Sequence, residues 1–336
     1  MTIPSMPAAK PSVSEMRDAL RRSGYLLESR VAALLQQRCM EVSTSTSYLD
    51  PDTGKSRELD IEACGLFRKI DDPGTDAGIW AKLLIECVNP PAPVVFFSSR
   101  PDSEWDHGYE RVKVVGTPRQ QPGDDLRYNW YWLLREIKAI ECHHYFAPGP
   151  VATQYCSFEV KKKGDNKGEW YANHRDQDYE ALRALAIATD YKACHQLEHM
   201  DEAFYAMQLV FFFPLLVIQG DIYSAQPRGR SVSLKRTDHV RLHWSRTVGR
   251  TYHRYQFDVV TERHLATYVA LLEKTLDGLA TRIKERMPAL WMDACARGEE
   301  FRSGRPRESS TPVPADLYER ARAERAADRA QWDCLE

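Results

Sequence analysis

The sequence predicts an α/β protein in which a mixed central sheet is flanked by helices. Residues 58–63 alternate acidic and apolar side chains, the period of two that indicates a half-buried strand. Residues 81–88 and 208–218 are nearly continuous apolar runs, which are typical of strands buried on both faces. Residues 176–195, between these runs, carry apolar side chains at helical spacing. A helix that joins two buried strands indicates a crossover connection in one sheet.

The elements before the first apolar run are helices, a strand and a turn. Residues 1–14 are polar and contain proline, and we expect them to form a disordered lead. Residues 14–37 predict one or two helices with a break at Ser23-Gly24, and residues 41–48, rich in Val, Ser and Thr, predict a strand. Residues 50–54 read Asp-Pro-Asp-Thr-Gly, which predicts a turn with an aspartate cap and a glycine at positive φ.

The second half continues the sheet and ends in helices. Residues 123–137 predict a helix, and residues 153–160 a strand that ends in a basic turn. Residues 231–260 predict several antiparallel strands, and residues 262–286 an amphipathic helix. The expected organisation is an α/β core with insertions over residues 15–225, strands and a helix that complete the domain over residues 226–290, and a linker with a charged helix over residues 298–336.

Composition limits the classes of function. The chain has 336 residues, of which 43% are hydrophobic and 28% charged, as in ordinary globular proteins. The formal net charge of −2 excludes an overall basic nucleic-acid binder, so any such contact must be a local patch. The 8 cysteines form no CxxC pair, which favours a reducing compartment. The most apolar stretch, residues 203–218, contains Pro214 and is too short to span a bilayer. With no signal peptide at the start, we expect a cytoplasmic protein without a membrane partner.

A carboxylate inside an apolar strand is the main anomaly of the sequence. Glu86 interrupts the run over residues 81–88, and burying a carboxylate there is costly unless a metal or a partner holds it. Asp60 lies on the preceding strand, and Glu28 lies close to the buried edge of a helix. Carboxylates on adjacent strands can share a divalent cation, and hard oxygen ligands suit Mg²⁺ (or Mn²⁺). We therefore expect Asp60 and Glu86 to ligate the metal, with Glu28 completing the site.

Residues 24–97 resemble the PD-(D/E)XK (restriction-endonuclease-like) nuclease superfamily, and the chain to about residue 220 follows it loosely. The resemblance is carried by residues 24–28, by Tyr-Leu-Asp-Pro-Asp-Thr-Gly-Lys-Ser-Arg-Glu-Leu-Asp-Ile-Glu-Ala, and by Ile-Glu-Cys before residues 94–97. Glu28 then matches the family's helix glutamate, Asp60 its strand aspartate and Glu86 the glutamate of the last motif. The family implies a core of a helix, a meander of strands, a crossover helix and a further strand. It also implies Mg²⁺-dependent phosphodiester hydrolysis, most plausibly of DNA, and a role in bacterial DNA defence or repair.

The chain departs from this family at one catalytic position. The motif lysine, which in the family orders the attacking water and steadies the phosphate, is replaced by Val88. Lys82 shares strand parity with Glu86, but its Cα lies about 13 Å away along an extended strand. Lys55 and Arg57, near the start of the aspartate strand, are better placed to contact the phosphate.

Three interpretations of the acidic residues follow from this departure. The first is an active deoxyribonuclease, because a metal alone can lower the pKa of bound water. The second is a nuclease fold retained as a DNA-binding or protein-interaction module. The third is purely structural, with Asp60 and Glu86 in a buried hydrogen-bonded pair with Arg57 or a backbone amide.

A basic segment supplies candidate contacts to nucleic acid. Residues 228–254 hold eight Arg and Lys residues against a single acid, Asp238, and basic residues interleaved with aromatics can follow a phosphate backbone. The alternative is a solvated hairpin whose arginines pair with acids elsewhere. The candidate contacts are Arg241, Arg246, Arg250, Arg254 and Trp244, and the weaker set is Lys161, Lys162 and Lys163.

Two further patterns receive no chemical role. Cys142-His143-His144 and Cys194-His195 lack the paired spacing of a structural zinc site, and we expect core or surface residues. Asp221 and Asp258 lie at the ends of apolar strands, where turn and cap residues are common.

Overall fold

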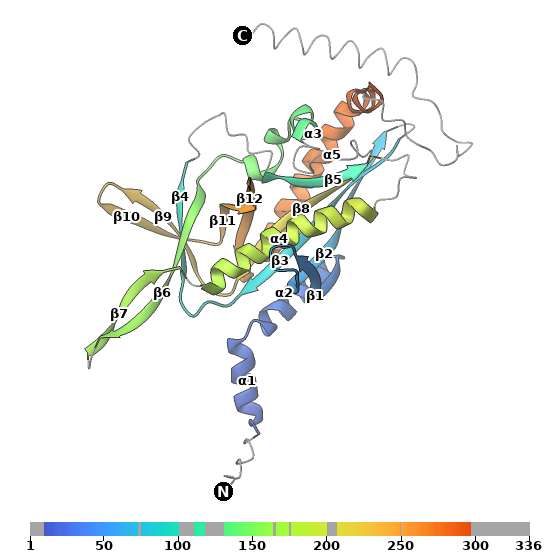
Figure 1. The fold of residues 1–336 in the computed structure, drawn as a ribbon. Helices are drawn as coiled ribbons and strands as arrows, with labels where there is room; N and C mark the ends of the chain where they lie inside the picture. Colours follow the sequence, from blue (N-terminus) through green and yellow to red (C-terminus); the bar gives the residue numbers. More distant parts are fainter. Residues whose placement is uncertain are drawn as a thin grey trace.

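The computed structural model describes residues 10–72, 75–100, 111–117, 131–163, 166–174, 176–199, 207–248 and 250–296. Twelve strands of these residues form one large mixed sheet (Figure 1), whose main order is β1-β2-β3-β8-β12-β11-β6-β4-β9-β10. Helices cover both of its faces. The predicted α/β class, with a mixed sheet flanked by helices, is confirmed.

The N-terminal part of the sheet is an antiparallel meander preceded by two helices. Its elements are α1 (Val13–Arg22), α2 (Tyr25–Gln37), β1 (Glu41–Asp50), β2 (Lys55–Asp72) and β3 (Thr75–Val88). The helix break at Ser23-Gly24 is confirmed, but α1 begins at Val13, inside the predicted disordered lead, because the Ser12 side chain caps it. The β1–β2 turn also forms as predicted: Asp52 N–H donates to the Asp50 carboxylate at 3.0 Å, and Gly54 has a φ of 66°.

A crossover helix connects β3 to its parallel neighbour. The helix α4 (Asp176–His199) precedes β8 (Met207–Ile218), which pairs with β3 from Ala77↔Met207 to Val88↔Ile218. The short strand β5 (Lys113–Thr117) pairs with β8 on its other edge. The predicted helix and central strand are therefore confirmed, and β3 is a central strand between β2 and β8.

The remaining strands extend the sheet beyond β8. The strand β12 (Thr251–Thr261) runs parallel to β8, and β11 (His239–Val248) pairs antiparallel with β12. The strands beyond are β6 (Val151–Lys163), β4 (Val94–Ser99), β9 (Ile222–Arg228) and β10 (Ser231–Thr237), with β7 (Asn166–Asn173) paired to β6. The β6–β7 and β9–β10 hairpins project away from the helices (Figure 1).

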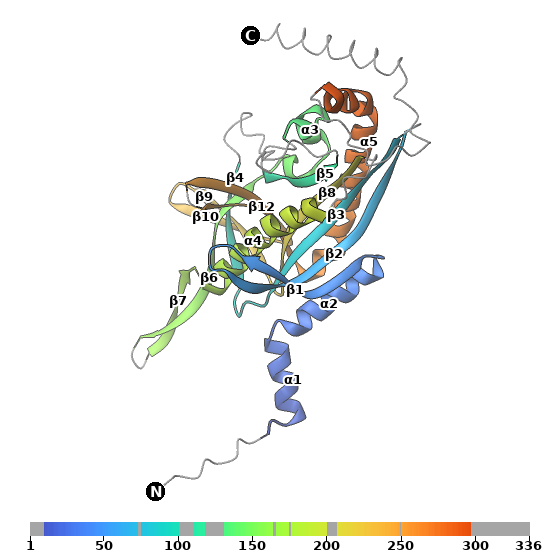
Figure 2. The ribbon, with the colours of Figure 1, turned by 45° about the vertical axis from the view of Figure 1, so that its right-hand side comes forward.

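Each face of the sheet carries its own hydrophobic core. One core contains buried residues of α2, α3 (Tyr131–Glu136) and α5 (Leu265–Ala296), and the other contains those of α4. Along β3, Leu83 and Ile85 belong to the first core, whereas Leu84 and Val88 belong to the second. Glu86 therefore lies on the α4 face by strand parity. Figure 2 shows α2 beside β1 and β2, with α1 extending away from the sheet.

Asp258, predicted as a turn or cap residue, is instead the centre of a buried polar network. Its carboxylate is fully buried and accepts hydrogen bonds from His144 Nε2 at 2.9 Å, His239 Nε2 at 2.7 Å and the Tyr268 hydroxyl at 2.7 Å. Burial opposes ionisation, but the two histidines outweigh it and hold the pKa of Asp258 well below its ordinary value. The prediction was wrong because these partners come from distant segments.

The other predictions at the level of elements have mixed outcomes. His143 and His144 are buried, which agrees with the expectation of core or surface residues. The helix over residues 262–286 is present as α5, which begins at Leu265 after a 3-10 turn. The predicted segments over residues 123–130 and 298–336 lie outside the described residues. Within the described part of the chain, no helix is long and apolar enough to cross a membrane.

The Asp258 network should make a measurable contribution to stability. Asp258→Asn keeps the size of the side chain but removes the charge that His144, His239 and Tyr268 share. We expect the free energy of unfolding in urea to fall by about 3 kcal/mol, the scale for breaking a buried charged pair. Asp221→Asn, at a more exposed aspartate that pairs with Arg236 and Arg263, is the control and should cost less than about 1 kcal/mol. Equal effects would show that the network contributes little.

Candidate functional site

The β2–β3 ladder ends where the acidic residues begin. Its outermost backbone pair at this end is Ile61↔Ile85. Beyond it, the Asp60 carboxylate accepts the backbone N–H of Cys87 at 2.8 Å. This bond is the backbone-amide contact of the structural interpretation, and it fixes the Asp60 carboxylate beside the end of β3.

Glu28 reaches the same place from α2. It lies in the first turn of the helix, directly above Gly24. A Cβ at position 24 would lie 3.1 Å from Glu28 Oε1 and 3.9 Å from the Cys87 carbonyl oxygen. The absence of a side chain at Gly24 therefore lets the start of α2 and the Glu28 carboxylate approach the end of β3.

The three carboxylates repel one another. Burial raises the pKa of Glu86 well above its ordinary value of 4.5, and the charges of Asp60 and Glu28 raise it further. Burial and Asp60 likewise raise the pKa of Glu28. Burial raises the pKa of Asp60, although the Cys87 N–H opposes this. The Cys87 thiol also experiences all three charges, since burial and then Asp60, Glu28 and Glu86 raise its pKa. We call Glu28, Asp60 and Glu86 the acidic cluster.

Glu86 differs from a neighbouring glutamate in having no cation. One carboxylate oxygen of Glu86, Oε1, is buried and has no hydrogen-bond partner among the described residues. Glu62, on β2, is held by Lys82 at 3.0 Å and by Lys192 of α4 at 2.7 Å. Burial opposes ionisation of Glu62, but these lysines outweigh it and lower the pKa. Glu62 is thus paired with two lysines, whereas Glu86 forms no ion pair within the described residues.

The position of the family's lysine is apolar. Val88 is only 4% exposed and packs in the α4-side core. Lys82 is held by Glu62 and by Gln196, at 3.0 Å from the amide oxygen. Among the described residues, the structure therefore shows no lysine that takes the place of the family's motif lysine beside Glu86.

The predicted phosphate contacts lie in a second group beside the acidic cluster. Arg57 pairs with Asp50 at 2.9 Å rather than with Asp60 or Glu86. Lys55 is exposed, opposite Asp50 in the β1–β2 register. Arg183 of α4 also contacts Asp50, at 3.1 Å, and burial of Asp50 is outweighed by its hydrogen bonds and arginines, which lower its pKa to about 2.

Asp52 brings one of the predicted nucleic-acid contacts to this group. Its carboxylate lies 3.3 Å from Arg183 and 3.2 Å from Arg246 of β11. We call Arg57, Arg183 and Arg246 the arginine cluster. It joins a predicted catalytic residue to a predicted nucleic-acid contact, and it adds Arg183, whose position on a long helix gave no signal in the sequence.

The Tyr48 hydroxyl interacts electrostatically with residues of both clusters. Its side chain is buried on the α4 face, and its hydroxyl has no hydrogen-bond partner among the described residues. Burial and then Glu86 raise the pKa of Tyr48 to about 12, while Arg57 and Arg183 oppose this shift. The hydroxyl therefore experiences charges from both clusters, a role that the sequence analysis missed.

The other predicted nucleic-acid contacts do not form one continuous strip. Trp244 packs in the α4-side core beside Tyr255 and Phe257 rather than presenting a free stacking face. Arg241 lies on the opposite face of β11 from Trp244 by strand parity. Arg254 lies over the Tyr252 ring, 5.6 Å from its centroid.

The remaining basic candidates lie at one turn and in one strand; the basic turn predicted after residue 160 is wrong, because residues 161–163 continue β6 in its pairing with β7. Arg250 is exposed at the β11–β12 turn. Lys161 is exposed on β6, where it pairs with Glu159 at 3.0 Å and lies 5.5 Å from the centroid of the Tyr171 ring. The backbones of Lys162 and Lys163 belong to β6, but their side chains lie outside the described residues.

The donor chemistry of the acidic cluster fits a hard divalent cation. All three side chains offer carboxylate oxygens, and Glu86 Oε1 is a buried acceptor without a partner. As these side chains stand, no group of three His, Cys, Asp or Glu residues in the described part of the chain is arranged to hold a metal ion. The cluster has the right ligand atoms, and its carboxylates would have to rotate toward a shared cation.

No protein family model, curated protein or solved structure matches this chain.

The raised pKa of Glu86 predicts a stability that falls as pH rises. A group whose pKa is raised on folding stabilises the protein below its unfolded value, near 4.5, and loses that contribution as pH increases through the folded value. Glu86→Gln should therefore unfold at higher urea than wild type at pH 8, by about 1.4 kcal/mol for each unit by which folding raises the pKa. The difference should shrink toward pH 4.

Glu62→Gln is the matched control, because its lysines lower the pKa of Glu62. This variant should be less stable than wild type at pH 8, with a difference that also shrinks at low pH. Two curves with the same sign would contradict the assignment of Glu86 as an uncompensated carboxylate.

Proposed function

We propose that the protein is a divalent-metal-dependent nuclease with a restriction-endonuclease-like core that hydrolyses phosphodiester bonds in DNA. The order of elements supports the proposal: α2, the antiparallel meander β1–β2–β3, the crossover helix α4, and β8 parallel to β3. This is the order that the resemblance to PD-(D/E)XK nucleases implies. The remaining strands would then be additions to that core.

The observation that carries the proposal is the acidic cluster itself. Its residues come from a helix and two strands, and burial raises the pKa of all three. The charge of Asp60 raises the pKa of Glu28 and of Glu86 further. Glu86 is half-buried, and its Oε1 has no hydrogen-bond partner among the described residues. Taking a carboxylate oxygen out of water without a partner is costly, so a fold that gained nothing from Glu86 would have a neutral side chain there. A bound cation would remove this cost.

In the proposed site, Asp60 and Glu86 hold Mg²⁺ or Mn²⁺, and Glu28 supports them. The metal, when bound, supplies a water of lowered pKa and charge that offsets the developing negative charge on the phosphate. The Cys87 N–H holds Asp60 in place. The arginine cluster attracts the DNA backbone, with Arg57 or Lys55 as the contact to the phosphate.

Cleavage of supercoiled plasmid and of single-stranded DNA tests the proposal. Wild type should cut with Mg²⁺ or Mn²⁺ and not with EDTA. Asp60→Asn and Glu86→Gln should each lower the rate by more than about 100-fold, because even groups that only orient metal ligands contribute about 10–100-fold.

Glu58→Gln is the control for this assay. Glu58 is an exposed acid on the same strand, two residues before Asp60, and its charge raises the pKa of Asp60. Its variant removes a nearby charge but no proposed metal ligand, so it should keep most of the activity. Cutting that survives both Asp60→Asn and Glu86→Gln would assign the activity elsewhere, and the proposal would fail.

The burial of Val88 favours a second candidate, a nuclease fold that binds DNA or protein without cutting. In this case well-folded wild type shows no cleavage with either metal, and Val88→Lys is the informative variant. Val88 shares the face of Glu86, so a lysine there would reach toward the acidic cluster. We expect Val88→Lys to gain metal-dependent cleavage and Val88→Met, of similar length but uncharged, to remain inactive. If Val88→Lys folds but does not cut DNA, the result would support a nuclease fold that binds DNA or protein without cleavage.

A further inference from the structure

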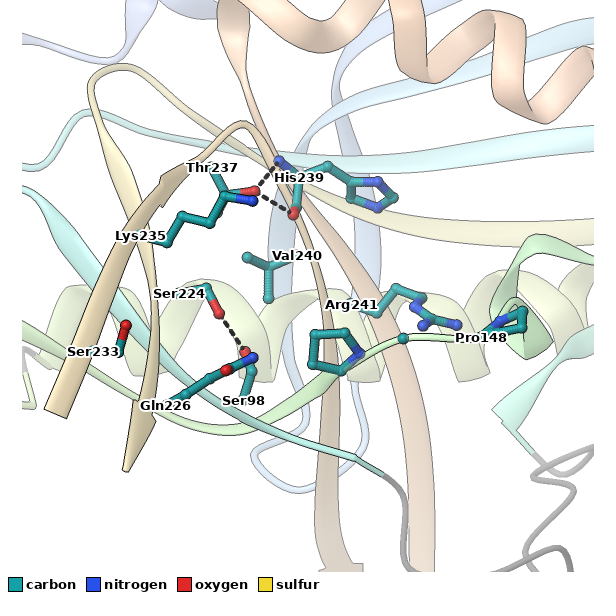
Figure 3. A pocket seen from close by; sticks show the side chains of 12 residues that line it. Ser98, Pro148, Ser224, Gln226, Ser233, Lys235, Thr237, His239, Val240 and Arg241 are labelled. Carbon is teal, nitrogen blue, oxygen red and sulfur yellow. Dashed lines mark hydrogen bonds between the residues drawn. The ribbon is translucent and has the colours of Figure 1, made fainter. Parts of the chain in front are cut away.

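A cavity of 510 Å³ lies away from the acidic cluster, in the C-terminal part of the sheet (Figure 3). It is open to solvent and is lined by β4, β9, β10 and β11 and by the segment before β6. Its size falls within the range of about 300–1,000 Å³ that is usual for small-molecule sites. One of the residues that line it, Arg241, is also a nucleic-acid contact predicted from the sequence.

Hydrogen-bonding groups without negative charge line this cavity. Hydroxyls come from Ser98, Ser224, Ser233 and Thr237, and Gln226 adds an amide. Among the described residues that line it, none carries a carboxylate. The Ser224 and Ser98 hydroxyls lie 3.2 Å apart, so the polar groups of β9 and β4 converge (Figure 3).

Two cations at the cavity have no carboxylate partner in the described part of the chain. Arg241 is half-buried, and its Nη1 donates to the carbonyl oxygens of His144, at 3.3 Å, and Tyr145, at 2.9 Å. Lys235, on β10, is exposed and forms no ion pair there. The neighbouring Arg236, which does not line the cavity, pairs with Asp221 at 2.6 Å. Lys235 is therefore the cation most available to a ligand, whereas the charge of Arg241 also interacts with the buried Asp258 opposite it in the β11–β12 pair.

His239 forms part of the same wall. Its Nε2 donates to the fully buried Asp258 at 2.7 Å, which fixes the orientation of the ring. The cavity thus has one wall held by the Asp258 network and another formed by the exposed β9–β10 hairpin.

We propose that this cavity binds the phosphate group of a nucleotide. Lys235 and the hydroxyls of Ser224 and Ser233 come from the β9–β10 hairpin, and Arg241 of β11 lies across the cavity from them (Figure 3). A lysine with several hydroxyls suits a phosphate better than a planar carboxylate held by one arginine, and Arg241 adds positive charge on the other side. The volume exceeds the needs of an inorganic ion, and Gln226 offers both a donor and an acceptor to the edge of a base.

The cavity is a second site rather than part of the acidic cluster. Glu86 pairs in register with Leu216, Leu216 with Val259, and Val259 with Val240, which lines the cavity. Three strand spacings separate Glu86 from Val240, about 14 Å along the sheet. The phosphate could belong to a free nucleotide or to the end of a nucleic-acid strand, and binding does not require that the acidic cluster cut DNA.

Calorimetric titration of the full chain in EDTA tests the proposal, because EDTA removes divalent cations from the acidic cluster. The probes are AMP, adenosine, inorganic phosphate, and one oligonucleotide with and without a 5′-phosphate. AMP should bind more tightly than inorganic phosphate, and adenosine should not bind measurably. Preference for the 5′-phosphorylated oligonucleotide over AMP would identify the strand end as the source, and the reverse order a free nucleotide.

Three variants assign the binding to the cavity. Lys235→Ala and Arg241→Gln should each weaken binding by about tenfold, the scale of one charge-assisted hydrogen bond. Ser233→Asp, at an exposed position, should abolish it by placing a carboxylate in the cavity. Arg236→Ala is the control and should bind as wild type does. The proposal would be overturned if neither AMP nor the oligonucleotide bound. It would also be overturned if Lys235→Ala and Ser233→Asp left the binding unchanged.

Discussion

The parallel pairing of β3 with β8 is the constraint on which the rest of the molecule depends. It runs from Ala77↔Met207 to Val88↔Ile218, and two parallel neighbours require a crossover, which α4 supplies. With β2 on its other edge and a core on each face, most of β3 is buried. A charge in its central part is costly unless it is compensated locally, which is why Lys82 and Glu86 are informative.

The charges of Lys82 and Glu86 are compensated to different extents. Lys82 pairs with Glu62 and Gln196, and the protein itself satisfies both charges. Glu86 has acidic neighbours instead, and one of its oxygens has no partner among the described residues. The arginines that could have neutralised it are bound to Asp50 and Asp52. This separation leaves the acidic cluster on one side of Tyr48 and, on the other, the arginine cluster paired with its own carboxylates.

The local sequence pattern predicted those strands and turns whose structure depends mainly on their own residues. The alternation around Asp60 predicted β2, the apolar run around Glu86 predicted β3, and Asp50 with Gly54 predicted the turn. The same alternation did not predict that β2 continues to Asp72, because its pairing with β3 passes through a register shift between Cys64 and Leu66. That extension depends on the partner strand rather than on the sequence of β2 itself.

The sequence could not predict contacts between residues that are far apart along the chain. Arg183 meets Asp50 across 133 residues, and His144 meets Asp258 across 114. No local period encodes such contacts. The sequence marked Arg57 and Arg246 as charged candidates, but the aspartates that hold them follow from the register of β1 and β2 and from the position of β11. Asp258 was misjudged for the same reason, since a strand end in sequence can be a buried centre in space.

The central claim is that the acidic cluster holds a divalent cation, and anomalous diffraction from crystals grown with Mn²⁺ tests it most directly. The account predicts an anomalous peak bounded by the Asp60 and Glu86 carboxylates, with Glu28 nearby, and no such peak in Glu86→Gln crystals. An empty position at saturating Mn²⁺, with the Glu86 side chain hydrogen-bonded as a neutral acid, would contradict the claim and leave Glu86 as a structural residue.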